Sequence, residues 1–395
     1  MKKRGIAGNS GENIRSDCKI ELTLNEVGKI KITLNSKVDS MYGESIRALV
    51  KEILEFYDID HAEVSVEDSG ALSHVIAARL EAAVKQVSNS RKGFLLPPVV
   101  TDLSPSTKER FRMSRLYLPG NNPAMMINAG IHEPDGIILD LEDSVAAEKK
   151  DEARILVRNA LRNINFYGAE RMVRINQLPL GLEDASAVVP HGIDLLLIPK
   201  CEEVWQVHEV EKVVKSALSG TSADKQVFLM PIIESALGVE NAFQIATASK
   251  QVVAMAIGLE DFTADLGVPR SDEGRESLFA RTRIVNACKA ARIQPIDSVY
   301  SDVGNMDGLL ENVKQSAALG FEGMGCIHPG QIRVIHEGFK PSSKEVERAK
   351  QIIEAFEEAA KKGLGVVSLG SKMIDPPVVK RAERTMLLAA KYNMI

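Results

Sequence analysis

The sequence is poor in features that mark several other classes of protein. Its only cysteines, Cys18, Cys201, Cys288 and Cys326, are scattered without the spacing of a metal site or a disulfide framework, so we expect a reducing cytoplasm. No apolar run of about eighteen residues could span a membrane, and no apolar run follows the basic start, as a secretory signal would require. A net charge of -5 gives no reason to expect nucleic acid or an anionic membrane as a partner.

Length and composition predict two folded units. The chain has 395 residues, of which 45% are hydrophobic and 26% charged, and this is too long for one ordinary hydrophobic core. Three prolines between residues 97 and 105, with Ser and Thr among them, are typical of a linker. We therefore predict a first domain at residues 1–88, a linker at 89–111, and a second domain with a C-terminal extension at 112–395.

The first domain has the hydrophobic patterns of a small α+β fold. Residues 19–24 (KIELTL) and 29–34 (KIKITL) alternate apolar and polar side chains on either side of a turn, which predicts a half-buried β-hairpin. Apolar residues recur at helical spacing in 45–56, alternate again in 62–66, and return to helical spacing in 76–84. The predicted order is ββαβα.

The second domain repeats a unit of strand, loop and helix. Its candidate strands are short apolar runs, as expected of parallel strands buried on both faces, at residues 116–118, 136–140, 171–175, 195–199, 227–231, 252–257, 295–300 and 323–326. Helical segments separate them, for example 149–161, 204–217, 281–291 and 306–319. Eight such units predict an α/β fold of the (β/α)8 TIM-barrel type. An open doubly wound sheet is the competing fold, but no glycine fingerprint follows the first strand.

Polar side chains follow nearly every predicted strand of the barrel. One of them alone would mean little, because helix N-termini prefer Asp and Ser as caps. An arginine and a lysine are harder to explain by capping. The candidates are Asp140 with Glu142, Arg174, Lys200, Glu234, Asp261, Asp297 and His328. Because catalytic residues of such barrels collect from several strand ends at one face, the sequence predicts an active site there.

Two of these carboxylates have the chemistry of a magnesium site. Glu234 follows an apolar strand in MPIIES, and Asp261 stands in GLEDFTADLG after the next strand. Mg²⁺ prefers oxygen ligands and keeps several waters, and the lack of an accompanying His or Cys argues against zinc. Alternatively, one carboxylate caps a helix and the other pairs with a surface lysine. Glu260 and Asp265 are interpreted as salt-bridge partners in the loop or as supports for the ligands.

Three basic side chains at strand ends each leave two interpretations open. Arg174, in VRIN, suits bidentate binding of a carboxylate, or it forms a structural ion pair with Glu142 or Glu170. Lys200, in IPK, would suit a Schiff base if burial removed its charge, but we favour a cation that faces anionic acids. His328, in IHPGQI, is interpreted as a structural hydrogen-bonding histidine in preference to a catalytic one.

Residues 113–395 resemble the β-subunit group of citrate lyase, with malyl-CoA and citramalyl-CoA lyases as relatives. The resemblance rests on motifs in order along the whole domain: RLYLPGNNPAMM, ILDLEDSV, VRIN, IPK, MPIIES, GLEDFTADLG, DSVYSDV, IHPGQI and GSKMIDPPVVKRA. It implies that Glu234 and Asp261 hold Mg²⁺ and that Arg174 binds a substrate carboxylate and assists catalysis. It also implies a homo-oligomer, a trimer or hexamer, in which Asp375 of a neighbouring subunit completes the site as the catalytic proton-transfer residue.

The same motifs imply further substrate contacts, and two departures from the family pattern bear on them. Met113 and Ser114 stand where the family often has Arg-Ser, with Arg115 after them, which affects the phosphate contacts of a CoA-like arm. Gly325 and Cys326 occupy the segment in which a lysine commonly precedes Ile-His-Pro. We expect substrate contacts from Arg115, Asn121, Asn122, Glu142, Asp143 and Lys200, in addition to Arg174 and Glu234.

The first domain resembles the γ-subunit acyl carrier protein of citrate lyase, through CKIELTL, KIKITLNSKVDSMYGESIRALV and VEDSGALSHVIAARLEAA. In that family the carrier serine lies just before the first strand, commonly in a Ser-Gly-Asp or Ser-Ser-Asp step. The matching residue here is Ser16, next to Asp17, with Ser10 as the alternative. The resemblance implies a phosphoribosyl-dephospho-CoA prosthetic group on this serine.

Together these features predict a fusion of a carrier with a Mg²⁺-dependent lyase. The expected reaction is a retro-Claisen cleavage of a citryl thioester to oxaloacetate and an acetyl thioester, with a separate acyl/CoA-transferase α-subunit that loads citrate. The alternatives are cleavage of free citramalyl-CoA or malyl-CoA, a pyruvate-forming aldolase of the same superfamily, and a carrier or scaffold whose catalysis lies in a partner subunit.

Overall fold

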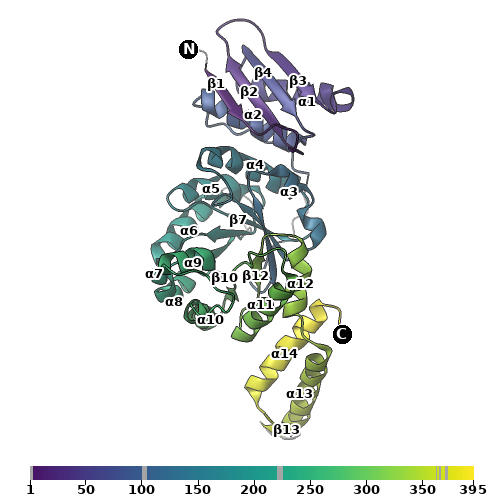
Figure 1. Ribbon diagram of the computed structural model, residues 1–395, viewed down its shortest axis with the longest axis vertical. Coiled ribbons are helices and arrows are strands. Elements are labelled where there is room, and N and C mark those ends of the chain that lie inside the picture. Colours follow the sequence, from purple (N-terminus) through teal and green to yellow (C-terminus); the bar gives the residue numbers. More distant parts are fainter. Residues whose placement is uncertain (1–2, 100–104, 220–225, 362, 364–365, 370–371) are drawn as a thin grey trace.

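Three parts follow one another along the longest axis of the molecule: an N-terminal α+β domain, a barrel of strands and helices, and a C-terminal arm (Figure 1). The structure, a computed structural model, describes residues 3–99, 105–219, 226–361, 363, 366–369 and 372–395. In these residues no helix is both long enough and apolar enough to cross a membrane.

The N-terminal domain is a four-stranded sheet against which two helices pack. Its spatial order is β1 (Arg4–Ala7), β2 (Cys18–Leu24), β4 (Ala62–Asp68) and β3 (Lys31–Ser36), with the helices α1 (Asp39–Phe56) and α2 (Ser73–Val87). Alternate residues of β2 are fully buried, namely Cys18, Ile20 and Leu22. The period of two in the sequence therefore marks the face that meets the helices.

Two details of this domain differ from the expectation. The predicted hairpin is wrong, because β4 lies between β2 and β3, antiparallel to β2 and parallel to β3. Alternation identifies the buried face of a strand but not its partner, and α1 supplies the long crossover that a parallel pair needs. The segment before residue 18, for which no strand is predicted from the sequence, contains the extra strand β1, which pairs antiparallel with β2.

Eight parallel strands form the barrel, and the predicted (β/α)8 fold is confirmed. Their order is β5 (Ser114–Pro119), β6 (Gly136–Asp140), β7 (Glu170–Arg174), β8 (Leu195–Ile198), β9 (Phe228–Ile233), β10 (Ala254–Ile257), β11 (Gln294–Ile296) and β12 (Met324–Cys326). Strand β12 returns to pair with β5, and a bridge between Asp297 and Met324 joins the last two strands. The strand expected at 295–300 is shorter, since residues 297–300 already belong to the loop at the barrel mouth.

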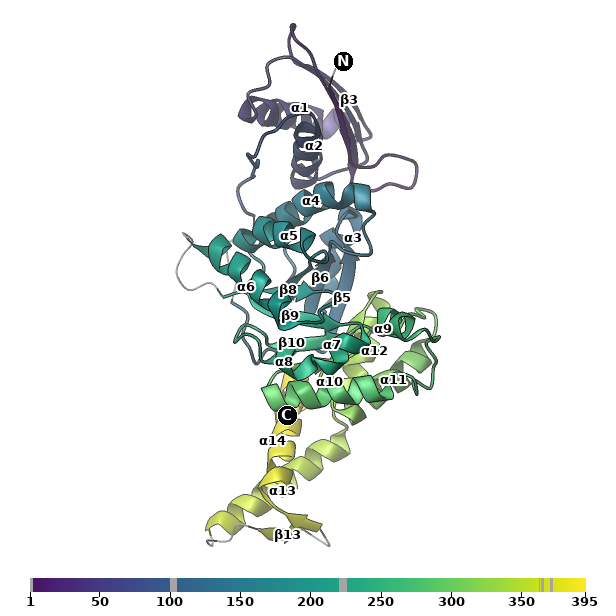
Figure 2. The same ribbon diagram turned by 90° about the vertical axis from the view of Figure 1, so that its left-hand side faces the viewer.

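Helices surround these strands (Figures 1 and 2). They are α3 (Pro123–Ile127), α4 (Lys150–Asn163), α5 (Leu180–Val188), α6 (Val204–Leu218), α7 (Ala236–Glu240), α8 (Ala242–Ala246), α9 (Leu259–Leu266), α10 (Leu278–Ala291), α11 (Met306–Leu319) and α12 (Gly330–Phe339). Inside the barrel, apolar side chains form a separate core that includes Ile138, Met172, Leu197 and Met230. The barrel is thus a filled core, and its strand ends are the part that can carry a site.

Buried ion pairs join the N-terminal domain to the barrel where α2 packs on α4. Arg79 of α2 donates to both oxygens of Asp17, at 2.9 and 3.0 Å, and lies 3.4 Å from Glu152 of α4. Arg158 of α4 donates to the two oxygens of Glu81, at 3.0 and 2.9 Å. We call these five residues the domain seam. Because its charges compensate one another, the seam fixes how the two domains meet.

The C-terminal arm stands away from the barrel (Figures 1 and 2). Helices α13 (Ser343–Lys361) and α14 (Pro376–Lys391) pack along each other, and β13 (Val367–Leu369) pairs with β14 (Lys372–Ile374) at the tip. Asp375 caps α14 there, accepting a hydrogen bond from the Val378 N–H at 3.2 Å. Met373 and Leu387 are exposed, so the arm presents apolar side chains to its surroundings.

Candidate active site

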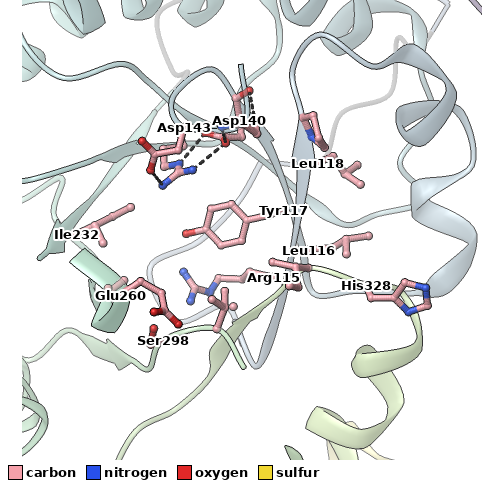
Figure 3. A pocket seen from close by; sticks show the side chains of 18 of the residues that line it. Arg115, Leu116, Tyr117, Leu118, Asp140, Asp143, Ile232, Glu260, Ser298 and His328 are labelled. Atoms are coloured by element: carbon pink, nitrogen blue, oxygen red, sulfur yellow. Dashed lines mark hydrogen bonds and ion pairs between the residues drawn. The ribbon is translucent and has the colours of Figure 1, made fainter. Parts of the chain in front are cut away.

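A cavity of about 800 Å³ opens at the carboxyl ends of the barrel strands (Figure 3). This is the size of a site for a small organic ligand. Of the residues that the sequence singles out, its lining contains Arg115, Asp140, Asp143, Arg174, Glu234, Asp261, Asp297 and His328. The barrel therefore gathers side chains that are as many as 213 positions apart in the sequence, from Arg115 to His328, as strand ends of this fold are expected to do.

Arg174, the last residue of β7, is held at the cavity wall by three carboxylates. Its Nε and Nη2 donate to the two oxygens of Asp140 at 2.6 and 2.8 Å, and Nη1 lies 2.8 Å from Glu142 and 3.3 Å from Asp143. Burial alone would lower the pKa of Arg174, but the hydrogen bonds and charge of Asp140 raise it. The guanidinium also lies 5.3 Å from the centroid of the Tyr117 ring. Arg174 is therefore a permanent and well-fixed positive charge.

Glu234, just after β9, is a buried carboxylate of the cavity lining. Its Oε2 accepts a hydrogen bond from the Lys200 N–H at 2.8 Å, while Oε1 faces Gly258, where an added Cβ would lie only 2.5 Å away. Burial raises the pKa of Glu234 to about 8, and the charges of Glu142 and Asp261 add to the rise. A cation beside Glu234 would relieve this accumulation of negative charge.

Lys200 and Asp261 face each other beside the cavity. Asp261 lies in the first turn of α9, and its Oδ1 is 3.3 Å from Lys200 Nζ. The amine also approaches Glu142 and Asp143, at 3.8 and 4.0 Å. Burial would lower the pKa of Lys200, but these carboxylates raise it. The surroundings suit a cation that faces acids and do not suit the neutral amine of a Schiff base.

The residues present fit a magnesium ion. Within the described ranges, no three His, Cys, Asp or Glu side chains are grouped as a metal cluster would require. Glu234 and Asp261 both line the cavity, and the protein would contribute their two carboxylates. This suits Mg²⁺, which keeps several waters and accepts further oxygens from its substrate. A side chain at Gly258 would collide with the Glu234 carboxylate, so the glycine is what allows Glu234 to occupy this position.

Three other polar residues at the cavity are engaged with protein neighbours. Asp297 lies 2.5 Å from Arg281 in a buried ion pair. His328 Nδ1 accepts a hydrogen bond from a backbone N–H two residues later, at 3.1 Å. Glu260 pairs with Arg270 at 2.7 Å, as the sequence suggested for this loop. These side chains shape the cavity wall.

The structure does not bring every expected residue to the cavity. Asn121 and Asn122, in the loop after β5, lie outside its lining, and so do Glu142 and Lys200, which contact lining residues from behind. The Asn121 carbonyl instead accepts a hydrogen bond from the N-terminal domain. Asp375 is the N-cap of α14 and is not among the residues that line the cavity of its own chain.

Two cavity residues were missed by the reasoning from sequence. Tyr117 follows Arg115 by two positions on β5, so both side chains point to the inside of the barrel (Figure 3). The spacing within RLYL was a signal that could have found it. Ser298 lines the cavity, and its Oγ accepts a hydrogen bond from the Leu259 N–H at 3.1 Å. No local signal marks that serine.

Ser16 lies in the loop before β2, in a left-handed backbone conformation with φ 56°. Its side chain is partly exposed, while the next residue, Asp17, is buried and bound by Arg79. The Arg79 Nη2 also donates to the Asn121 carbonyl at 2.9 Å. The Ser16 loop is therefore anchored beside the loop that follows β5, at the cavity end of the barrel. Ser10 is also partly exposed in the same lead segment.

Models of protein families match both main parts of the chain. The family described as HpcH/HpaI aldolase/citrate lyase matches residues 113–329. The family described as malonate decarboxylase delta subunit (MdcD), an acyl carrier protein family, matches residues 2–87.

Individual relatives and a solved structure agree with these matches. The citrate lyase subunit beta of Leuconostoc mesenteroides subsp. cremoris is 39% identical over 296 residues, 73% of this chain and 96% of the relative. The mitochondrial citramalyl-CoA lyase of Homo sapiens is 34% identical over 294 residues, 71% of this chain and 86% of the relative. The crystal structure of CitE from Mycobacterium tuberculosis with magnesium, acetoacetate and coenzyme A has a TM-score of 0.59 and 27% identity, covering 72% of this chain and 100% of that chain.

Proposed function

Because the chain belongs to the HpcH/HpaI aldolase/citrate lyase family and is a carbon–carbon lyase, we propose that it cleaves a citryl thioester to oxaloacetate and an acetyl thioester with Mg²⁺. The observation that carries this proposal is a single cavity lined by the carboxylates of Glu234 and Asp261 and by the fixed cation of Arg174. The M. tuberculosis relative binds magnesium together with coenzyme A, which supports the same chemistry here.

The reaction is a retro-Claisen cleavage, in which the tertiary hydroxyl loses its proton as the C–C bond breaks. Mg²⁺ held by Glu234 and Asp261 would lower the pKa of that hydroxyl and polarise the new carbonyl. Arg174, fixed by Asp140, presents its positive charge to the cavity, where negative charge develops on the departing thioester enolate. Because its partners hold Arg174 in place beforehand, little reorganisation is needed during the reaction.

The hydroxyl proton requires a base and the enolate carbon requires an acid, and we assign both roles to Asp375 of the partner subunit, whose carboxylate would accept the proton and then return it to the enolate. In its own chain Asp375 lies between β14 and α14, and these elements belong to an arm that stands away from the barrel (Figure 2). It would therefore reach a cavity only by contact with a second copy of the chain. The exposed Met373 and Leu387 support such a contact. We propose a homo-trimer or hexamer in which each arm completes a neighbouring site.

The N-terminal domain, at residues 1–88, would carry the acyl group on a phosphoribosyl-dephospho-CoA arm attached to Ser16. The anchoring of the Ser16 loop beside the loop after β5 supports this role, because an arm on Ser16 would start at the cavity end of the barrel. Tethering raises the effective concentration of a substrate to about the millimolar range. Residues 89–111 would serve as the linker. A separate acyl/CoA-transferase α-subunit would load citrate onto the arm.

A second candidate function is cleavage of free citramalyl-CoA. The 34% identity to the human citramalyl-CoA lyase supports it. The chemistry is the same, and only the oxo-acid product changes, from oxaloacetate to pyruvate.

Cleavage of citryl-CoA by the purified protein tests the proposal directly. We expect release of oxaloacetate with Mg²⁺ and none with excess EDTA. Release of pyruvate from citramalyl-CoA alone would keep the mechanism and change the substrate. No cleavage of citryl-CoA, citramalyl-CoA or malyl-CoA would contradict lyase activity of this chain and favour a carrier or scaffold. Intact mass of the protein would show separately whether Ser16 carries the arm.

A further inference from the structure

One buried arginine in the barrel has no partner of opposite charge. Arg115 of β5 is 1% exposed and belongs to the cavity lining. Its Nη1 contacts the sulfur of Met230 at 3.1 Å, and its Nε has no hydrogen-bond partner. Within the part of the chain that the structure describes, no carboxylate lies at ion-pair distance from it. The sulfur is only a weak acceptor, so the charge of Arg115 is uncompensated.

The other buried arginines of the described residues all have carboxylate partners. Each lies between 2.5 and 2.9 Å from an Asp or Glu oxygen: Arg79 with Asp17, Arg112 with Glu170, Arg158 with Glu81, Arg171 with Asp194, and Arg281 with Asp297. The chain therefore follows a consistent rule for burying guanidinium groups, and Arg115 is the exception. The pair with Arg112 also means that Glu170 is not the partner of Arg174.

Such an exception is costly unless something else supplies the anion. A charge in an apolar interior without a partner loses several kcal/mol of solvation, and burial lowers the pKa of Arg115. The side chain points from β5 into the cavity below Tyr117 (Figure 3). A ligand in the cavity can therefore reach it, and a planar guanidinium suits two oxygens of one carboxylate.

We propose that Arg115 binds the second carboxylate of the oxo-acid half of the substrate and so selects a dicarboxylic over a monocarboxylic product. The inference rests on the proposed function and extends it to specificity. A citryl group carries one carboxylate on the carbinol carbon and another on a methylene arm. A citramalyl group has a methyl group in place of that arm, and a malyl group has hydrogen.

Arg174 is a weaker candidate for the second carboxylate. It already has Asp140, Glu142 and Asp143 as partners, whereas Arg115 has none. A substrate carboxylate at Arg174 would compete with three protein carboxylates. At Arg115 it would compensate an otherwise unpaired charge. The two arginines would thus have different roles: Arg174 lies beside the reacting atoms, and Arg115 binds the carboxylate on the methylene group of the substrate.

The test compares citryl-CoA with citramalyl-CoA in the wild type, Arg115→Met and Arg115→Lys. Methionine has a similar length without the charge. Lysine keeps the charge but lacks the planar guanidinium that can donate two hydrogen bonds to one carboxylate. The wild type should prefer citryl-CoA in kcat/KM. Arg115→Met should lose about 10- to 100-fold on citryl-CoA and change little on citramalyl-CoA, with Arg115→Lys in between. Two results would overturn the inference while leaving lyase activity established. One is a wild type that prefers citramalyl-CoA, and the other is an Arg115→Met variant whose ratio of kcat/KM on citryl-CoA to kcat/KM on citramalyl-CoA equals that of the wild type.

A binding measurement keeps the inference testable without turnover. Fresh oxaloacetate and pyruvate are added with Mg²⁺, and the shift in unfolding temperature is recorded. The wild type should respond at roughly 10-fold lower oxaloacetate than pyruvate, and Arg115→Met should respond equally to both. Equal responses in the wild type would reject the subsite. If no thioester is cleaved but the preference for oxaloacetate depends on Arg115, the proposed function fails and the subsite stands.

Discussion

The domain seam and the cavity both bury charged side chains, but the cavity leaves two of them, Glu234 and Arg115, without an ion-pair partner among the described residues. At the seam, Arg79 lies 2.9 Å from Asp17 and 3.4 Å from Glu152. In the cavity, Glu234 accepts one backbone hydrogen bond, and Arg115 contacts a methionine sulfur. Burial is similar in the two regions, so burial alone does not separate structure from function. The lack of an ion-pair partner at Glu234 and Arg115 is what points to a ligand.

This difference matches the ligands that the proposed reaction requires. The seam stabilises one arrangement of two domains, and it needs nothing from outside the chain. The cavity leaves a carboxylate at Glu234 and a guanidinium at Arg115, which a cation and a substrate carboxylate would compensate. Ligand binding would then compensate the charges of Glu234 and Arg115 that the folded chain leaves unpaired, so part of the stability of the protein depends on its ligands.

Glu234→Gln should have the largest effect on the cavity. Glutamine keeps the size of the side chain but removes the charge that would hold Mg²⁺, so we expect cleavage to fall about a thousandfold or more. The measurement is oxaloacetate release at saturating Mg²⁺, with the unfolding temperature as a check of the fold. Glu311→Gln, at an exposed position on α11, is the control and should keep its full rate. Full activity of Glu234→Gln would exclude this residue from the metal site.

Arg79→Met should have the largest effect on the seam. It would leave Asp17 buried without a cation and Glu152 with Lys149 alone, and breaking such a pair from one side costs about 3–5 kcal/mol. Chemical denaturation measures the loss. Lys51→Met, which removes an exposed cation of the same domain, should change stability by less than about 1 kcal/mol. Equal losses in the two variants would show that the seam contributes no more than a surface ion pair.

Much of this fold could be predicted, because most of it is encoded locally. The barrel strands are apolar runs at regular intervals, so their number and order follow from the sequence. The partners of the strands in the N-terminal sheet do not, since the pattern of β2 is compatible with either β3 or β4 beside it. Strand β1 was missed because its four residues, Arg4–Ala7, are too few to show a period.

The candidate site could be predicted as a set of residues but not as a set of contacts. Strand ends identified Arg174, Glu234 and Asp261, because a barrel brings such positions to one face. That Arg174 is compensated and Arg115 is not depends on the directions of side chains from different strands. Asp375 illustrates the other limit, because its expected role needs a second copy of the chain.

His74 of α2 lies beside the seam, where Asn159 of α4 donates a hydrogen bond to its backbone carbonyl at 3.0 Å, and its buried side chain forms no ion pair that would compensate a charge. Its Nε2 has no hydrogen-bond partner, and burial lowers its pKa to about 4 from 6.5. The unfolded chain therefore binds a proton more readily, so stability is lost as pH falls from 6.5 towards 4, by about 3 kcal/mol. Denaturation of the wild type and His74→Leu between pH 7 and pH 4 measures this. If the free energy of unfolding changes with pH in the same way in both proteins, His74 is not the group that lowers stability at acidic pH.

Arg115→Met should have the smallest effect on stability and yet separates the two regions most clearly. At the seam, removing Arg79 leaves the buried carboxylate of Asp17 without a cation. In the barrel, removing Arg115 leaves no unpaired anion among the described residues, and it places an apolar side chain against Met230. We therefore expect Arg115→Met to be as stable as the wild type or up to about 2 kcal/mol more stable in ligand-free buffer. Denaturation with and without oxaloacetate and Mg²⁺ measures this, and the ligands should stabilise the wild type more than the variant. A loss as large as that of Arg79→Met would show that Arg115 already has a structural partner, and the distinction between the seam and the cavity would then fail.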